Sequence, residues 1–306
     1  MALVPGYWQH PPAPKPGLYP GEVDNRSEIR EFLVSRRARI TPEQAGLIAY
    51  GRNRRVPGLR REEAAMLAGV SVDYYTQIER GRLDGVSESV LDAIAGALRL
   101  DEAERAYFFD LARSANTRSR PRRPARDRVR PTLQHMLDAM TEAPALIRNA
   151  RMDIIASNRL GRALYYPAFE DPVRPVNLVR FAFLNPEATA FYVDWEDMAS
   201  IAVSILRTAA GRDPGDRDLS DLIGELSTRS EPFRERWAAR DVRLHRTGTK
   251  QFRHPVVGEI SLGYEAMELD GGQGDSLSAY TAEPGSPSDD ALKLLASWAA
   301  TVDASA

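Results

Sequence analysis

The segment LRREEAAMLAGVSVDYYTQIERGR, residues 59–82, constrains the fold more than any other part of the chain. Residues 59–69 predict a short helix that ends at Gly69, because glycine is favoured just past a helix C-terminus. Ser71 is a favoured residue for a helix N-cap and predicts a second short helix, VDYYTQIER. Two short helices joined by such a tight turn predict a helix-turn-helix.

The neighbouring segments predict further helices around this pair. Residues 27–46 predict a helix with Ser27 as a candidate N-cap, and residues 86–100 predict another with Ser87 as its cap. Residues 101–115 predict a further helix that follows directly. Five helices with short connections predict a compact all-α domain over residues 27–115.

The remaining N-terminal and connecting segments lack the residues that build a core. We predict that residues 1–26 form a disordered tail, because prolines stand where a signal peptide would be apolar. Residues 116–130 contain seven Arg, two Pro and one Asp, and therefore predict a linker. The chain has no cysteine and no apolar run near the ~20 residues of a membrane helix. We expect a cytoplasmic protein with no membrane partner.

The second half, residues 131–303, changes from helices alone to helices and strands. Residues 143–158 predict a hairpin around an Asn-Ala-Arg turn, and residues 250–285 predict two or three antiparallel strands. Residues 188–212 predict one long amphipathic helix, and other helices are expected over 131–140, 218–227, 232–240 and 288–302. This mixture predicts an α+β domain with an antiparallel sheet.

Charge divides the chain in the same place. Residues 22–130 hold 22 Arg against 17 Asp and Glu, a net of +5, whereas residues 131–306 carry a net of −8. A basic first half and an acidic second half indicate that the first half meets a polyanion, although Arg-rich surfaces are common enough that this observation decides little.

The second helix of the pair has one face free to read DNA. If Tyr75 and Ile78 point inward, Thr76 and Gln77 face outward and can hydrogen-bond to base edges in the major groove. Arginines at both ends of the pair are suited to phosphates. The predicted DNA-binding residues are Arg60, Arg61, Ser71, Val72, Asp73, Thr76, Gln77, Arg80 and Arg82.

The run Gly-Val-Ser (69–71) followed by Ile-Glu-Arg-Gly (78–81) resembles the lambda-repressor-like, Xre-type helix-turn-helix. The longer run GRNRRVPGLRREEAAMLAGVSVDYYTQIERGR is similar to the MmyB-like subfamily of these regulators, as are FRHPVVGEISLGYEAMEL and AYTAEPGSPSDDALKLLASW near the C-terminus. Arg61 stands where many relatives of the wider superfamily have Gln, and Val72 replaces a commonly polar residue, which suggests contact with a thymine methyl group.

The resemblance implies a PAS-like ligand-binding domain over residues 131–303 and a small lipophilic ligand such as a fatty acid. Aromatic residues could line the pocket, with Phe191, Tyr192 and Trp195 expected on one helix, although core packing explains each of them equally well. Asn158 fits a ligand donor or, more simply, a helix cap, and His254 fits a carboxylate partner or a structural histidine. The candidate ligand-binding residues are Asn158, Tyr192, Trp195, Trp237, His254 and Tyr264.

These observations predict a homodimeric, ligand-responsive transcriptional regulator that binds double-stranded DNA. The alternative is a constitutive DNA-binding or protein-recruiting module without a small-molecule ligand. The sequence has no nucleophile, metal or phosphate-binding motif, and its histidines are scattered, so we expect no catalytic residue, no metal ligand and no cofactor.

Overall fold

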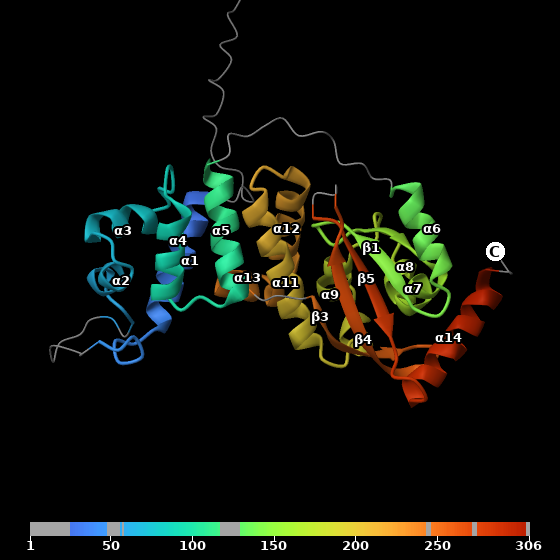
Figure 1. Cartoon of the computed structure of the whole chain (residues 1–306). Helices are drawn as coiled ribbons and strands as arrows, with labels where there is room; N and C mark the ends of the chain where they lie inside the picture. The colour runs from blue at the N-terminus through green and yellow to red at the C-terminus, as the bar shows by residue number, and fades with distance from the viewer. Residues whose placement is uncertain are drawn as a thin grey trace, which may run out of the picture.

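A computed structural model describes residues 25–47, 56, 58–116, 129–242, 246–270 and 274–303. An all-helical unit at the N-terminus lies beside a larger unit of helices and one sheet (Figure 1). The predicted tail and linker lie outside the described residues, except that Asn25 and Arg26 belong to the first helix, Asn116 ends the fifth, and Val129 and Arg130 precede the sixth.

The five helices predicted for the N-terminal domain are present. They are α1 Asn25–Arg39, α2 Arg61–Leu67, α3 Val72–Glu79, α4 Glu88–Ala97 and α5 Glu102–Asn116. Phe32 of α1, Ile78 of α3 and Phe108 of α5 are fully buried and meet in one core. Ser27 does not cap α1: the helix begins at Asn25, and the Ser27 hydroxyl donates to Glu31 one turn later.

Local signals place the helix-turn-helix. The Ser71 hydroxyl accepts from the Tyr74 amide at 3.1 Å, and Ser87 accepts from Val90 in the same way at the start of α4. Gly69 has φ +65°, a left-handed conformation that glycine adopts without strain. These caps confirm both predicted helix starts.

The C-terminal domain is built on a five-stranded antiparallel sheet. The strands are β1 Ala145–Arg148, β2 Ile154–Ser157, β3 Thr247–His254, β4 Gly258–Glu268 and β5 Ser276–Thr281, in the order β2-β1-β5-β4-β3. The predicted hairpin is β1 with β2, and the predicted strands near the C-terminus are β3, β4 and β5. The α+β class is confirmed.

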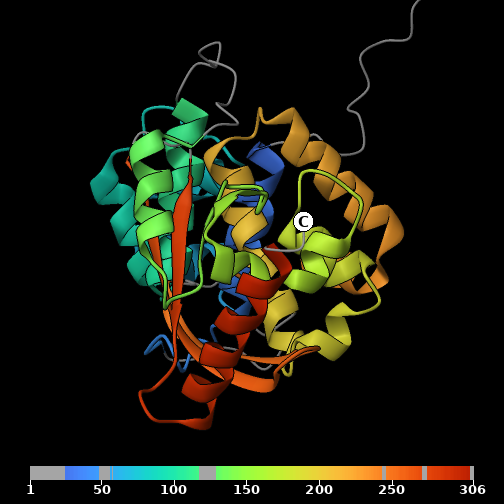
Figure 2. The same ribbon diagram turned by 90° about the vertical axis from the view of Figure 1, so that its right-hand side faces the viewer.

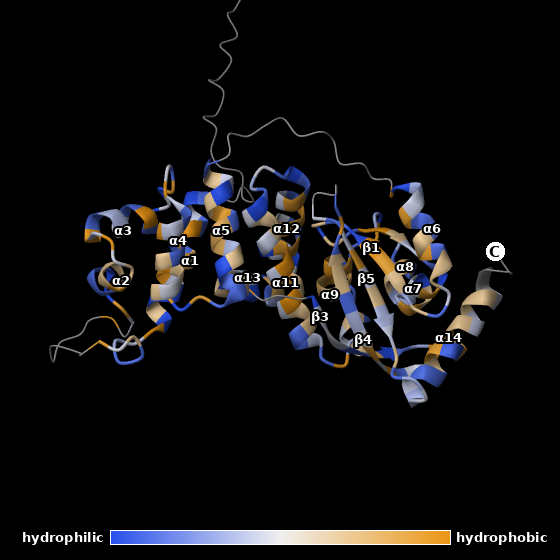
Figure 3. Ribbon diagram, in the orientation of Figure 1, coloured by the Kyte–Doolittle hydropathy of each residue, from blue (hydrophilic) through white to orange (hydrophobic). Residues whose placement is uncertain are grey.

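The helices of this domain pack on the sheet and on each other. They are α6 Pro131–Ala139, α7 Arg159–Leu164, α8 Tyr166–Glu170, α9 Leu178–Leu184, α10 Ala188–Phe191, α11 Trp195–Arg212, α12 Arg217–Arg229, α13 Glu231–Ala239 and α14 Pro287–Asp303. Along β1, Leu146 faces the large core, in which α11 takes part, and Ile147 faces the small cluster under α6. Hydrophobic colour on β1 and α11 in Figure 3 marks two elements of the large core. Figure 2 views the side of the domain that carries α14.

The single helix predicted over residues 188–212 is interrupted. Tyr192 is extended, with ψ 121°, and forms a bridge with Phe252 of the edge strand β3. Asp194 then caps α11 by accepting from the Asp197 amide at 3.0 Å. The strand pairing and the new cap therefore outweigh the helical pattern, and Tyr192 and Trp195 do not share a helix.

The two domains pack directly on each other. Helices α11 and α13 of the C-terminal domain lie between the sheet and helices α1 and α5 (Figure 1). Val242, which follows α13, is buried in the core of the N-terminal domain. No helix within the described ranges is long and apolar enough to cross a membrane.

Candidate DNA-reading surface and ligand pocket

Helix α3 buries one face and exposes the other, as predicted. Tyr75 and Ile78 are fully buried, Gln77 and Asp73 are exposed, and Thr76 is half-buried. Val72 is 42% exposed, so its side chain is free to meet an apolar group such as a thymine methyl. The arginines at positions 60, 61, 80 and 82 are all exposed around this helix pair. The surface thus offers exposed polar side chains flanked by cations, which is the arrangement that base reading requires.

Two of the predicted DNA contacts also hold the domain together. The Arg61 Nε donates to Glu79 at 2.6 Å, and Arg37 donates to the other oxygen of the same buried carboxylate at 2.7 Å. The Ser71 hydroxyl is engaged in the α3 cap. Arg61 remains about half exposed, so it orients the helix pair and still presents positive charge outward.

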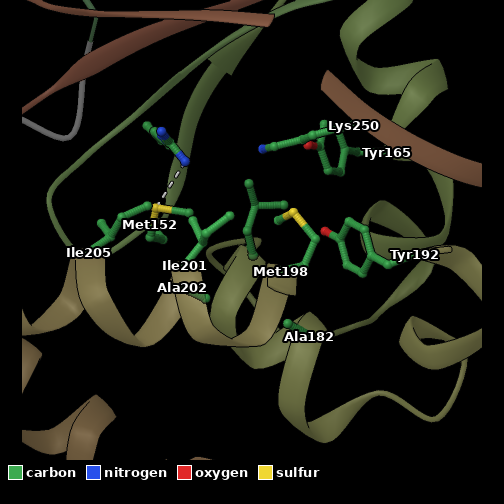
Figure 4. Close-up of a pocket in the computed structure, with 11 residues that line it drawn as sticks. Met152, Tyr165, Ala182, Tyr192, Met198, Ile201, Ala202, Ile205 and Lys250 are labelled. Carbon is green, nitrogen blue, oxygen red and sulfur yellow. Dashed lines mark hydrogen bonds between the residues drawn. The ribbon is translucent and has the colours of Figure 1, made fainter. Parts of the chain in front are cut away.

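A closed pocket lies in the C-terminal domain between α11 and the sheet. Figure 4 shows Met198 and Ile201 of α11 beside Lys250 of β3, Tyr165 and Tyr192. The apolar part of the lining comes from Met152, Leu178, Ala182, Met198, Ile201, Ala202 and Ile205. The free space between the side chains holds about one water molecule. The pocket is therefore small.

Two cationic side chains complete the lining. Arg148 is 5% exposed and Lys250 is 6% exposed. Arg148 donates to Ser276 Oγ and Met152 Sδ, both at 3.1 Å, and the Lys250 ammonium lies 3.5 Å from the Tyr280 hydroxyl. Neither cation has a carboxylate partner among the described residues.

Electrostatics in the pocket follow from this arrangement. Burial, with the nearby positive charge of Arg148, lowers the pKa of Lys250 well below its usual value. Burial raises the pKa of Tyr165, Tyr192 and Tyr280, so these phenols stay protonated. Tyr165 and Tyr280 share a hydrogen bond of 2.7 Å. The polar groups around the cations are thus neutral, and none of them offsets the charge of Arg148.

A protein-family model matches each of the two domains. A model described as the MmyB-like transcription regulator ligand binding domain matches residues 129–295, more than half of the chain. The chain belongs to the MmyB-like transcription regulators. A second model, a helix-turn-helix domain, matches residues 34–108 of this MmyB-like regulator. A comparison with curated proteins found no match. A DNA-binding domain thus precedes a ligand-binding domain, as the sequence predicts.

Of the six ligand-binding residues predicted for this MmyB-like regulator, Tyr192 lines the pocket. Tyr264 lies next to it: its ring is 4.7 Å from the Lys250 ammonium, and its hydroxyl donates to the Thr247 carbonyl oxygen. Burial raises the pKa of Tyr264 to about 12.

The other four predicted ligand-binding residues are not among the side chains that line the pocket, and each has a structural partner. Asn158 accepts from the Ala145 and Gly161 amides, which makes it the cap of α7, and its amide donates to two backbone carbonyls. Trp195 donates to the Ala182 carbonyl oxygen. Trp237 lies at the domain junction, beneath the Arg207 guanidinium. These three side chains therefore do not face a ligand in this pocket.

His254 is also a structural residue. Its Nε2 donates to the Ala163 carbonyl oxygen at 2.9 Å, and its Nδ1 accepts from the Val256 amide. Burial lowers its pKa, which favours the neutral ring that makes both bonds. His254 is 2% exposed and is not among the residues that line the pocket.

Sequence reasoning missed Arg148 and Lys250. A signal for Lys250 was present, because Lys250, Phe252 and His254 alternate along β3 and all three are buried. Lys250 is one of three lysines in the whole sequence, so its place on an inward-facing row is unusual. Arg148 ends a strand of four buried residues, ALIR, which is a weaker signal.

Proposed function

We propose that this MmyB-like regulator binds an amphipathic anion, such as a long-chain fatty acid, in the pocket between α11 and the sheet. The observation that carries the proposal is a buried arginine, Arg148, beside a buried lysine, Lys250, at a pocket whose remaining lining is largely apolar. A buried arginine keeps its charge, and a buried charge is costly without an opposite charge or hydrogen bonds. A ligand carboxylate would supply the counter-charge, and an alkyl tail would pack on α11.

The pocket must also enlarge before it can hold such a ligand. Pockets for small molecules measure ~300–1,000 Å³, far more than the room for about one water found here. Flexible methionines at positions 152 and 198 can repack around a tail, because an unbranched side chain has several rotamers. The remaining volume requires α11 to move away from the sheet.

We propose further that the protein acts as a cytoplasmic homodimer. One recognition helix contacts about half of a DNA site, and two-fold pairing places two such helices ~34 Å apart on successive turns of the major groove. The ligand would then alter DNA affinity through its preference for one arrangement of the two recognition helices. In this proposal the protein binds and regulates, and carries out no catalysis.

Titration calorimetry of the purified full chain tests the ligand class. We expect hexadecanoate to bind, hexadecanol to bind at least about tenfold more weakly, and hexadecylamine not to bind, because only the acid supplies an anion near Arg148. Arg148→Met should weaken hexadecanoate and leave hexadecanol unaffected. Arg180→Met is the matched control, because Arg180 pairs with Glu225 away from the pocket. Equal binding of acid and alcohol would contradict the proposal.

DNA binding is tested on a labelled fragment from upstream of the gene. Hexadecanoate should change the affinity of the wild-type protein for this fragment and leave that of a non-binding Arg148→Met variant unchanged. Tight DNA binding that no added lipid alters would favour the constitutive module instead.

A further inference from the structure

Helix α11 takes part in both the pocket and the domain junction. Met198, Ile201, Ala202 and Ile205 recur at spacings of three and four and form the face toward the pocket. Arg207 and Gly211 lie roughly 180–220° around the helix from Met198, at ~100° per residue. The same rigid helix therefore presents one face to the ligand site and the opposite face to the DNA-binding domain.

The face toward the DNA-binding domain is anchored by a buried ion pair. Arg207 is 1% exposed, and its Nη1 donates to Glu28 Oε1 of α1 at 2.5 Å. The Tyr107 hydroxyl of α5 donates to the same oxygen at 2.7 Å. Arg207 also donates to the Trp237 carbonyl oxygen and lies over the Trp237 ring. We call Arg207, Glu28 and Tyr107 the junction triad.

An ion pair exposed to water would be separated at little cost in free energy, whereas this buried pair resists separation. Separating Arg207 from Glu28 leaves the buried Arg207 guanidinium without an opposite charge, which is strongly unfavourable. Near the end of α11, Arg212 pairs with Asp110 of α5 at 2.8 Å and adds a second anchor. Any displacement of α11 must therefore carry α1 and α5 with it or break buried contacts.

A second connection runs beside the first. Arg36 of α1 donates to the Arg240 carbonyl oxygen at 2.7 Å, Arg39 pairs with Asp241 at 2.5 Å, and Val242 is buried in the N-terminal core. Strand β3 begins soon afterwards at Thr247 and carries Lys250 into the pocket. Both walls of the pocket are thus continuous with segments fixed to the DNA-binding domain.

We propose that α11 transmits occupancy of the pocket to the DNA-binding domain through the junction triad, so that each ligand-filled protomer holds its recognition helix in a different orientation. This inference rests on the proposed ligand function. The pocket is small, so a ligand tail that enters it displaces α11 from the sheet. Packed interfaces respond to such a displacement by a discrete shift rather than by gradual deformation. Arg207 is a positioning residue in this scheme, since it touches no ligand.

Hydrogen exchange of the full chain with and without hexadecanoate tests the proposal. In the wild-type protein the ligand should change exchange in α11 and also in α1 and α5, which lie outside the pocket. In Arg207→Met the ligand should bind at least as tightly, because the junction opposes displacement of α11 less, and the change in α1 and α5 should be clearly smaller than in the wild type, since Arg212 and residues 240–242 still join the domains. Arg207→Lys, which retains the charge, should restore part of the response.

Arg180→Met is again the control: it removes an Arg–Glu pair within the C-terminal domain and should leave the response of α1 and α5 intact. Ligand-induced changes confined to the C-terminal domain of the wild-type protein would overturn the coupling while leaving the proposed ligand function standing. A response of α1 and α5 that is as large in ligand-bound Arg207→Met as in the wild type would overturn it equally. If hexadecanoate does not bind the wild-type protein, the ligand function fails and the coupling fails with it.

Even if Arg207→Met does not fold, hydrogen exchange of the wild-type protein decides whether the pocket and the DNA-binding domain are coupled. A DNA readout then gives the size of the effect. The ratio of hexadecanoate Kd values for free and DNA-bound protein should be about fivefold or more in the wild type and clearly closer to one in Arg207→Met. By linkage the same ratio must appear in the DNA affinities, which provides an internal check.

Discussion

Gly211 of α11 lies directly against the ring of Tyr107 in α5, so closely that a methyl group at Gly211 would come within 2.5 Å of Tyr107 Cε2. The glycine lets the two domains approach at the point where the Tyr107 hydroxyl donates to Glu28. A larger residue would separate α11 from α5 or force the ring out of place.

We therefore expect Gly211→Ala to lower the free energy of unfolding by about 1–3 kcal/mol, because inserting atoms into a close-packed contact strains it. Urea denaturation measures the change. Gly96→Ala is the matched control: Gly96 lies in α4 with open space around it, and alanine there should stabilise by about 0.5–1 kcal/mol through helix propensity. A Gly211→Ala protein as stable as the wild type would show that the contact between the two helices is loose.

Lys250 should make stability depend on pH in the alkaline range. Its pKa is lower in the folded protein than in the unfolded chain, so the unfolded chain binds the extra proton. The free energy of unfolding should rise with pH between the lowered pKa and the usual value near 10.5, and should fall as pH drops through that window. Urea denaturation at several alkaline pH values should show this slope in the wild type, and Lys250→Met should reduce it. An unchanged slope in the variant would mean that Lys250 stays charged in the folded protein.

Ligand binding should take up a proton. An anion beside Lys250 favours its charged form and so opposes the effect of burial and of Arg148. Calorimetry in two buffers of different ionisation enthalpy should report uptake of up to about one proton with hexadecanoate at a pH above the lowered pKa, and none with hexadecanol. The uptake should vanish in Lys250→Met. Uptake that survives this substitution would assign the proton to another group.

The carboxylate of Glu79 should be essential for the DNA-binding domain. It is 1% exposed and holds both Arg37 and Arg61. Glu79→Gln should lower the free energy of unfolding by about 3–5 kcal/mol, since breaking a buried pair leaves charge unmatched. Glu259→Gln, in an exposed pair with Arg253, should cost less than about 1 kcal/mol. Thermal unfolding of the two variants compares them, and similar losses would contradict the role given to Glu79.

Substitutions at Gln77 and Arg82 should affect DNA binding in different ways, because we expect Gln77 to contact bases and Arg82 to contact phosphates. Gln77→Ala should reduce discrimination between the preferred site and random DNA by about 1–3 kcal/mol, with little effect on binding to random DNA. Arg82→Ala should weaken both, and should reduce the slope of log K against log salt by about 0.9. Fluorescence anisotropy at several salt concentrations measures both quantities. A Gln77 variant that loses specific and random binding equally would contradict its outward, base-reading role.

The DNA-binding domain could be predicted from sequence because its signals are local. Ser71 and Ser87 cap helices within three residues of themselves, and Gly69 marks a turn by its own conformation. The pocket could not be predicted, because Arg148 and Lys250 stand 102 positions apart and meet only when β1 and β3 enter one sheet with α11 above it. Of the aromatic candidates, Tyr192 lines the pocket, whereas Trp195 and Trp237 are not among its lining residues.

The burial of Val242 in the N-terminal core has a practical consequence for dissecting this protein. A fragment that ends after α5 would lack a side chain that fills its interior, and would expose Arg36 and Arg39 without their partners at Arg240 and Asp241. A chimera that joins this DNA-binding domain to a foreign sensor must therefore also import residues 240–242, which lie more than a hundred positions beyond the cut. The structural unit that an engineer should move from this protein is therefore discontinuous in sequence.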